Sequence, residues 1–178
     1  MAHNFDLAIE HVRKWEGGYV SDVADPGGAT NHGVSLRMAL ADAEVNVDFD
    51  GDGDEDADDI KAMTWEQAKE IYRQKYWCYD NVQDGKIACK LMDMSVNMGP
   101  PRSHKICQQA LNNCGGWNLK VDGAWGPATE RAVNSTDPKL LLTMMTERHL
   151  AFYRGLVAEK PALRKFLKGW ERRAQSIV

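Results

Sequence analysis

The feature that most constrains the fold is a helical pattern near the N-terminus that ends abruptly at Gly17–Gly18. Glycine adopts the left-handed capping conformation without a Cβ clash, so two glycines in a row end a helix. Glu16 falls on the apolar face just before that end. A carboxylate on a core-facing surface is costly unless it is paired or takes part in chemistry. Glu16 is therefore a candidate general acid. The apolar face is formed by residues at helical spacing, namely Phe5, Ala8, Ile9, Val12 and Trp15.

A second carboxylate and a hydroxyl follow in a glycine-rich stretch. Asp25 and Thr30 lie within the run from Asp25 to Gly33, whose Gly and Pro residues let the chain fold back towards Glu16. Two carboxylates that flank a scissile bond, one protonated and one ionised, are the usual equipment of a glycosidase. The alternative is that a helix-ending Glu before a Gly-Gly turn is an ordinary surface feature.

These residues form part of a pattern that resembles glycoside hydrolase family 108, the N-acetylmuramidases found among phage endolysins and related bacterial proteins. The resemblance implies that Glu16 is the general acid, that Asp25 is a general base or charge stabiliser, and that Thr30 helps to hold water. The segments that carry the resemblance span nearly the whole chain: 16–19, 25–35, 64–68, 71–72, 76–77, 93–99 and 121–126.

Three further residues are candidate sugar contacts. Tyr19 belongs to the first of these segments, and Asp93 and Asn97 lie four residues apart on one edge of a predicted helix. Side chains at that spacing share a face and could line a sugar cleft through hydrogen bonds. A solvated helix face would show the same spacing, so both interpretations remain open.

The sequence predicts a mainly α-helical protein with a lysozyme-like catalytic lobe. Strands are scarce, and we expect at most a small hairpin around 19–34. Local capping signals predict helix starts at Ser35, at Thr64 with Gln67, and at Asp137 before Pro138.

A break at Gly99–Pro100–Pro101 predicts two lobes. Residues 1–98 would form the muramidase lobe, and residues 99–178 a helical lobe for peptidoglycan binding. The segment from Val121 to Thr129 resembles the Asp-Gly turn of peptidoglycan-binding modules.

An acidic segment at 48–59 follows the EF-hand loop pattern, with a glycine at position six. The final ligand is Asp rather than Glu, as in the loops of dockerins. Hard oxygen ligands in this order predict Ca²⁺, and the alternative is a solvated acidic insertion. The predicted ligands are Asp48, Asp50, Asp52, Asp54, Asp56 and Asp59.

The net charge of −4 conceals an uneven distribution. Ten of the 26 acidic residues lie between Asp42 and Asp59, where no basic residue occurs, so the remaining chain carries 22 basic against 16 acidic residues. A cationic body suits a polyanionic substrate such as the bacterial envelope. No nucleic-acid motif is present, and no apolar run is long enough to span a membrane.

The N-terminus lacks a secretory signal, which predicts synthesis in the host bacterial cytoplasm and action at the cell wall after release. The closing helix, around 163–177, has the composition of a core-packed helix or of a membrane-surface helix, and we favour the core.

We therefore expect a calcium-binding, monomeric endolysin of the bacteriophage type. It would hydrolyse the β-1,4 bond between N-acetylmuramic acid and N-acetylglucosamine in peptidoglycan. A lytic transglycosylase is the alternative among enzymes. A noncatalytic, calcium-gated peptidoglycan-binding module is the alternative outside them.

Overall fold

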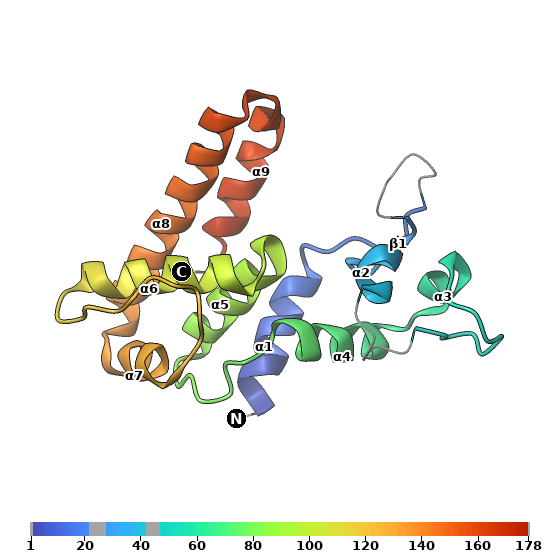
Figure 1. The fold of residues 1–178 in the computed structure, drawn as a ribbon, viewed down its shortest axis with the longest axis horizontal. Helices are drawn as coiled ribbons and strands as arrows, with labels where there is room; N and C mark the ends of the chain where they lie inside the picture. The colour runs from blue at the N-terminus through green and yellow to red at the C-terminus, as the bar shows by residue number, and fades with distance from the viewer. Residues whose placement is uncertain (1, 22–27, 42–46, 178) are drawn as a thin grey trace. The chain divides into compact units, whose positions relative to one another are not determined.

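A computed structural model describes residues 2–21, 28–41 and 47–177 (Figure 1). The prediction of a mainly α-helical fold is confirmed, since helices make up most of these ranges. Within the described ranges, no helix combines the length and apolarity needed to cross a lipid bilayer. The chain divides into two compact units: Glu10–Lys75, and Met1–Ile9 together with Tyr76–Val178. This division passes through two helices, α1 (Ala2–Arg13) and α4 (Trp65–Tyr76).

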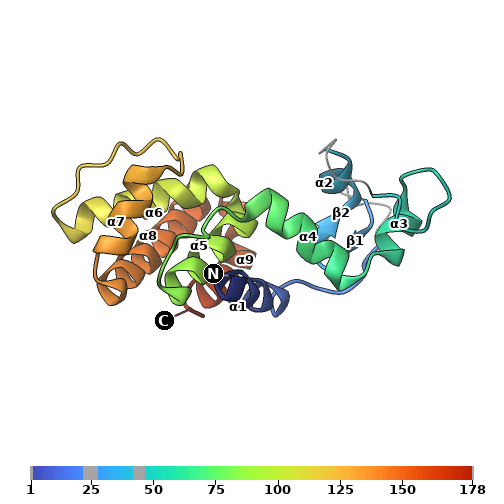
Figure 2. The same ribbon diagram turned by 90° about the horizontal axis from the view of Figure 1, so that it is seen from below.

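The smaller unit holds a short antiparallel hairpin and two short helices, gathered at one end of α4 in Figure 2. The Ser35 side chain accepts a hydrogen bond from the Met38 N–H and starts the first of these helices, as predicted. Thr64 and Gln67 form the predicted capping box ahead of α4, with the Thr64 N–H 2.8 Å from Gln67 Oε1. The additional elements are β1 (Thr30–Asn31), β2 (Val34–Ser35), α2 (Leu36–Leu40) and α3 (Ala57–Ala62).

One buried amide ties the hairpin to α3. Asn31 on β1 donates from its side chain to the backbone carbonyls of Ile60 and Met63, at 3.0 and 3.3 Å. Buried polar groups need such partners, because an unsatisfied one costs about 1–3 kcal/mol. The strand that carries Thr30 is thus fixed to the helix that follows the acidic segment.

The larger unit is a helical bundle in which α5 packs on α6 and α8, and α8 lies against α9. Gly99 has a φ of 81° and separates α5 from α6 by a single residue, so the predicted break is a tight corner. Asp137 caps α8 as predicted, 2.8 Å from the Leu140 N–H. The elements are α5 (Gly85–Met98), α6 (Pro100–Cys114), α7 (Pro127–Ser135), α8 (Pro138–Glu159), the 3₁₀ turn η1 (Pro161–Leu163) and α9 (Arg164–Ala174).

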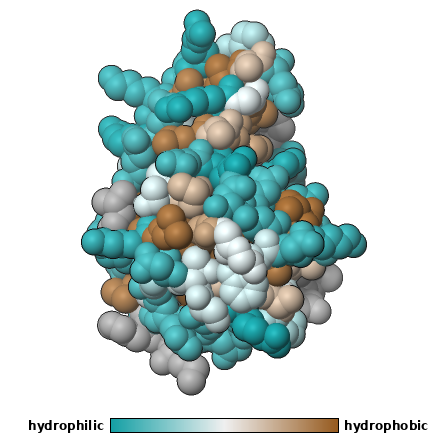
Figure 3. Space-filling view, turned by 90° about the vertical axis from the view of Figure 1, so that its left-hand side faces the viewer, coloured by the Kyte–Doolittle hydropathy of each residue, from teal (hydrophilic) through white to brown (hydrophobic). Residues whose placement is uncertain are grey.

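Apolar side chains fill the interior of the larger unit, and Leu91, Leu111, Leu141 and Met145 are fully buried. On the face drawn in Figure 3, hydrophobic residues lie in small separate patches among hydrophilic ones. All four cysteines are free.

Candidate active site

Glu16 lies just beyond the C-terminal end of α1. The helix tightens into a last turn, with the Trp15 and Glu16 N–H groups both directed at the Val12 carbonyl, at 2.9 and 3.2 Å. Gly17 and Gly18 follow, and the space around them is open: a Cβ added to either glycine would meet no atom within 4 Å. The predicted glycine cap is wrong: α1 ends at Arg13 and continues as hydrogen-bonded turns to Glu16, and neither Gly17 nor Gly18 has the positive φ of a left-handed cap. The Glu16 side chain is half-buried.

Gly33, at the turn between β1 and β2, lies against the side chain of Glu16. Its φ is 79°, in the left-handed region that favours glycine. A Cβ on Gly33 would lie 2.6 Å from Glu16 Oε2 and would overlap the hydroxyl of Tyr72. The hairpin turn, α4 and the end of α1 therefore meet at Glu16 with no room for a side chain between them.

Tyr72 on α4 is a site residue that the sequence did not reveal. Its ring is almost fully buried, and its hydroxyl donates to the His32 carbonyl at 2.9 Å. In the sequence, Tyr72 belongs only to a segment of the family resemblance, 71–72. No local signal indicated that its hydroxyl reaches a turn 40 residues away.

Within the smaller unit, the side chains of His32, Trp65 and Arg13 pack against one another beside the Gly33 turn. The His32 ring meets Trp65 edge-on at 5.7 Å, and the Arg13 guanidinium lies 4.7 Å above the Trp65 ring. Burial and, second, the charge of Arg13 lower the pKa of His32. His32 is accordingly neutral at neutral pH and adds no charge beside the turn.

The other predicted catalytic residues are distributed as follows. Thr30 lies on β1, where its backbone pairs with Val20 through two hydrogen bonds of 2.8 Å. The segment that follows Glu16 therefore pairs, at Val20, with the strand that carries Thr30. Tyr19 is 41% exposed and available to a ligand, whereas Asp25 lies outside the described residues.

Asp93 was expected to contact sugar, but it is a core carboxylate. Its side chain has no exposed surface and accepts a hydrogen bond of 2.8 Å from Arg173 Nε on α9. A side chain that solvent cannot reach does not line a sugar cleft. Asn97, one turn further on, is exposed, and its amide donates to the Asp93 carbonyl at 2.8 Å.

The surroundings of Asp93 form a buried polar cluster within the larger unit. Lys90, fully buried on the same helix, donates to the carbonyl of Ala174, and burial lowers its pKa to about 8. Burial, followed by the charges of Lys90 and Arg173, lowers the pKa of His149 to about 3. The cluster therefore joins α5, α8 and α9 with a neutral imidazole among two cations and one carboxylate.

A glycine turn also anchors the loop between α6 and α7. Gly123 has a φ of 84°, and a Cβ there would lie 2.6 Å from the Pro101 carbonyl. Its N–H donates to Gln108 Oε1 at 2.9 Å, while its carbonyl lies 2.9 Å from His104 Nδ1. The Asp-Gly turn noted in the sequence is thus packed tightly onto α6.

The acidic segment forms a loop closed by its own last carboxylate. Asp59 is 1% exposed. Its Oδ1 accepts from the N–H groups of Phe49 and Asp50, at 2.7 and 3.2 Å, and its Oδ2 from that of Asp56, at 2.7 Å. These bonds lower the pKa of Asp59, with the Asp56 N–H the largest cause.

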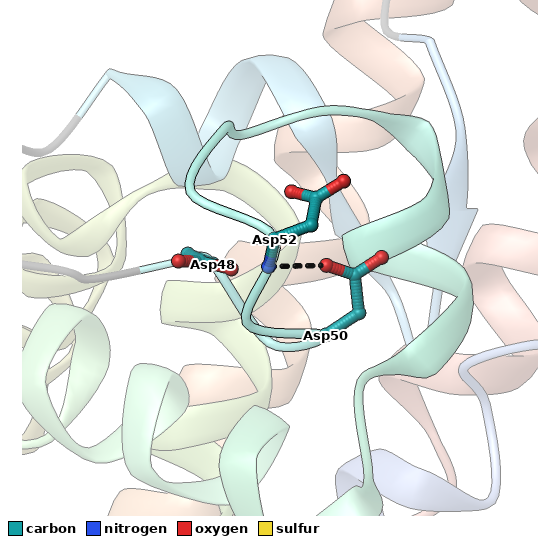
Figure 4. A group of neighbouring side chains, drawn as sticks. All are labelled: Asp48, Asp50 and Asp52. Atoms are coloured by element: carbon teal, nitrogen blue, oxygen red, sulfur yellow. Dashed lines mark hydrogen bonds between the residues drawn. The ribbon is translucent and has the colours of Figure 1, made fainter.

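The remaining carboxylates crowd together around this closure. Figure 4 shows Asp48, Asp50 and Asp52, with the Asp52 N–H 3.2 Å from Asp50 Oδ1. One oxygen from each of these three lies within 4.8 Å of the others, and the same holds for Asp54, Asp56 and Asp59. Gly53 takes a φ of 95°, which permits the sharp turn expected at position six.

Repulsion between the carboxylates of this loop contributes to raised pKa values at two of them. The charge of Asp52 is the largest cause that raises the pKa of Asp54 above its ordinary value. At Asp50 the Asp52 N–H lowers the pKa, but desolvation and the neighbouring carboxylates outweigh it and the net shift is upward. Such a loop favours binding of a hard cation.

We expect Gly33→Ala to reduce catalytic activity by at least about tenfold, because the added methyl group displaces the Glu16 carboxylate, and small misplacements of catalytic groups carry penalties of that size. Initial rates on purified peptidoglycan would measure the loss. Gly116→Ala is the matched control, since Gly116 has a φ of 82° but open space around its Cβ position. Equal activity of the two variants would contradict this arrangement.

Two family models match successive parts of the chain and meet near residue 100, not at the boundaries of the two compact units. The family model Glycosyl hydrolase 108 matches residues 9–99, and the model Predicted Peptidoglycan domain matches residues 102–175. The structure is similar to that of Brucella abortus SagA, with a TM-score of 0.69 and 26% sequence identity over 99% of this chain and 97% of that chain. No curated protein matches the sequence. The chain belongs to the glycosyl hydrolase 108 family and, with its peptidoglycan domain, is a peptidoglycan hydrolase.

Proposed function

We propose that the enzyme is an N-acetylmuramidase that hydrolyses the β-1,4 bond between N-acetylmuramic acid and N-acetylglucosamine, with Glu16 as the general acid. The observation that carries this proposal is the packing of Glu16 against Gly33 and Tyr72. An acid must be held within hydrogen-bond reach of the oxygen that it protonates, and this contact restricts where the carboxyl group can point.

Asp25 and Thr30 complete the proposed reaction. Asp25 acts as general base or charge stabiliser, and Thr30 helps to position the attacking water. Their assignment rests on the family resemblance, supported for Thr30 by the backbone pairing that links its strand to the chain after Glu16. Tyr19 and Asn97, both exposed, are the proposed sugar contacts that remain.

Product analysis tests the bond and the reaction. Purified peptidoglycan digested with the enzyme should yield fragments with reducing N-acetylmuramic acid ends, each heavier by one water than the corresponding anhydro product in mass spectrometry. Anhydro ends would assign a lytic transglycosylase, and reducing N-acetylglucosamine ends would assign the other glycosidic bond. A lack of any soluble fragment would leave a binding module.

We also propose that the loop of residues 48–59 binds Ca²⁺. Six carboxylates supply hard oxygen ligands, and no basic residue lies among them. A carboxylate offers about four lone-pair sites, so the three amide bonds to Asp59 leave one for a metal ion. Ca²⁺ would offset the repulsion that raises the pKa values of Asp50 and Asp54. The hydrogen bond from the Asn31 side chain on β1 to the Ile60 carbonyl on α3 connects the loop to the strand that carries Thr30.

Calcium is expected to raise the melting temperature and the lytic rate, and EDTA to reverse both effects. A ligand at one hundred times its Kd stabilises the folded state by about 2.7 kcal/mol. Asp50→Ala/Asp52→Ala should abolish the response, whereas Glu55→Ala, at a position that supplies no ligand in the EF-hand pattern, should retain it. A response in stability alone would leave calcium a purely structural role. No heat of binding in calorimetry would remove the site.

The setting that we propose is that of a phage-type endolysin, active as a monomer on the bacterial cell wall. The cationic surplus outside the acidic segment supports attraction to an anionic envelope.

A further inference from the structure

A groove of about 660 Å³ lies along α8 in the larger unit, at a distance in sequence from every proposed catalytic residue. This volume falls within the range of small-ligand sites, roughly 300–1,000 Å³. One wall is a single face of α8, with residues three or four positions apart: Lys139, Leu142, Thr143, Thr146, Glu147 and Leu150. The first turn of α5 and Gln175 supply additional lining. We call this feature the α8 groove.

The face of α8 that lines the groove combines leucines and threonines with one lysine and one glutamate. Leu142 is buried and Leu150 half-buried, while Lys139 and Glu147 are exposed. The two charged residues are eight positions apart, which corresponds to about 12 Å along a helix. Among the described residues, neither side chain takes part in an ion pair. The face of α8 therefore presents a cation and an anion, with Leu142, Thr143 and Thr146 between them.

This arrangement selects a particular class of ligand. A neutral glycan strand would favour an aromatic stacking surface, and no aromatic side chain is among the described residues that line the groove. The lining carries two cations, Lys86 and Lys139, and two anions, Asp84 and Glu147, so it favours neither a polyanion nor a polycation. A short peptide with both a carboxylate and an amine meets all three features, since three to four extended residues at roughly 3.3 Å each span the distance between the charges.

We propose that the α8 groove binds the stem peptide of peptidoglycan, with a carboxylate at Lys139 and the free amine of its diamino acid at Glu147. This inference rests on the proposed function, because it names the part of the same substrate that the larger unit recognises. The glycosidic bond is cut elsewhere, so the groove retains the enzyme on the wall by a part of the substrate that the reaction leaves intact.

Calorimetric titration of the full-length protein with a synthetic stem tetrapeptide tests the proposal. Lys139→Glu and Glu147→Lys should each weaken binding by about tenfold, since each replaces an attraction with a repulsion. Thr143→Trp, which fills the groove from an exposed position, should abolish binding. Arg131→Glu, an equal change of charge on the exposed face of α7, should leave it unchanged. Melting temperatures verify that each variant folds.

Acetylation of the peptide amine gives a sharper test. The acetylated peptide should bind the wild type about tenfold more weakly than the free peptide, but should bind Glu147→Gln as well as the free peptide does, because the contact is already lost. Loss of equal size in both proteins would overturn the contact with Glu147. Failure of the wild type to bind the tetrapeptide would overturn the proposal itself. Neither outcome depends on glycosidase activity, so an inactive enzyme that binds the peptide refutes the proposed function alone.

Discussion

Glu16→Gln is expected to lower the rate of peptidoglycan hydrolysis by about 10²–10⁴-fold, the range that general acid–base catalysis supplies. The amide keeps the shape of the side chain and its packing against Gly33, but it has no acidic proton to give to the leaving oxygen. The decrease in turbidity of outer-membrane-permeabilised cells measures the effect, and release of soluble fragments from purified peptidoglycan verifies it.

The fold should survive this change, so the melting temperature of Glu16→Gln should match that of the wild type within a few degrees. Glu10→Gln, on an exposed position of α1, is the control and should retain full activity. A Glu16→Gln variant with more than about a tenth of wild-type activity would exclude Glu16 as the general acid, because that loss is below the acid–base range.

Asp93→Ala is expected to destabilise the larger unit by about 3–5 kcal/mol, the usual result of removing one partner from a buried ion pair. Arg173 is only 12% exposed, and Lys90 is a second buried cation nearby, so the variant loses a buried negative charge beside two positive ones. Urea unfolding followed by circular dichroism measures the free energy of unfolding.

An exposed ion pair between α8 and α9 offers a matched control for burial. Arg154 and Glu171 pair through the same atoms, Nε and a carboxylate oxygen, at 2.7 Å against 2.8 Å for the buried pair. Their side chains are 61% and 28% exposed, and exposed pairs contribute about 0.2–1 kcal/mol. Glu171→Ala should therefore cost no more than about 1 kcal/mol. Similar losses in the two variants would show that Asp93 does not stabilise the fold through a buried charge.

The sequence predicted those features whose determinants lie within a few residues of one another. Ser35 caps the helix that it precedes, and Thr64 and Gln67 bond reciprocally, because each feature depends only on local backbone geometry. The loop pattern at 48–59 likewise predicted the positive φ of Gly53.

What the sequence could not predict depends on contacts between distant residues. Asp93 lay on a helix edge by spacing, yet its partner Arg173 is 80 residues away. The contact of Tyr72 with the turn at His32 depends on how α4 packs against the hairpin. Periodicity identifies which face of a helix is buried. It does not identify the neighbour that covers that face.

The closure of the acidic loop by Asp59 has an evolutionary consequence. The carboxylate that shapes the loop comes from the loop itself, through bonds to Phe49, Asp50 and Asp56. A segment that is closed by its own hydrogen bonds can be inserted or deleted in one in-frame event without other substitutions in the surrounding chain. Relatives that differ by this block alone would then differ in the proposed calcium site while sharing the same catalytic residues.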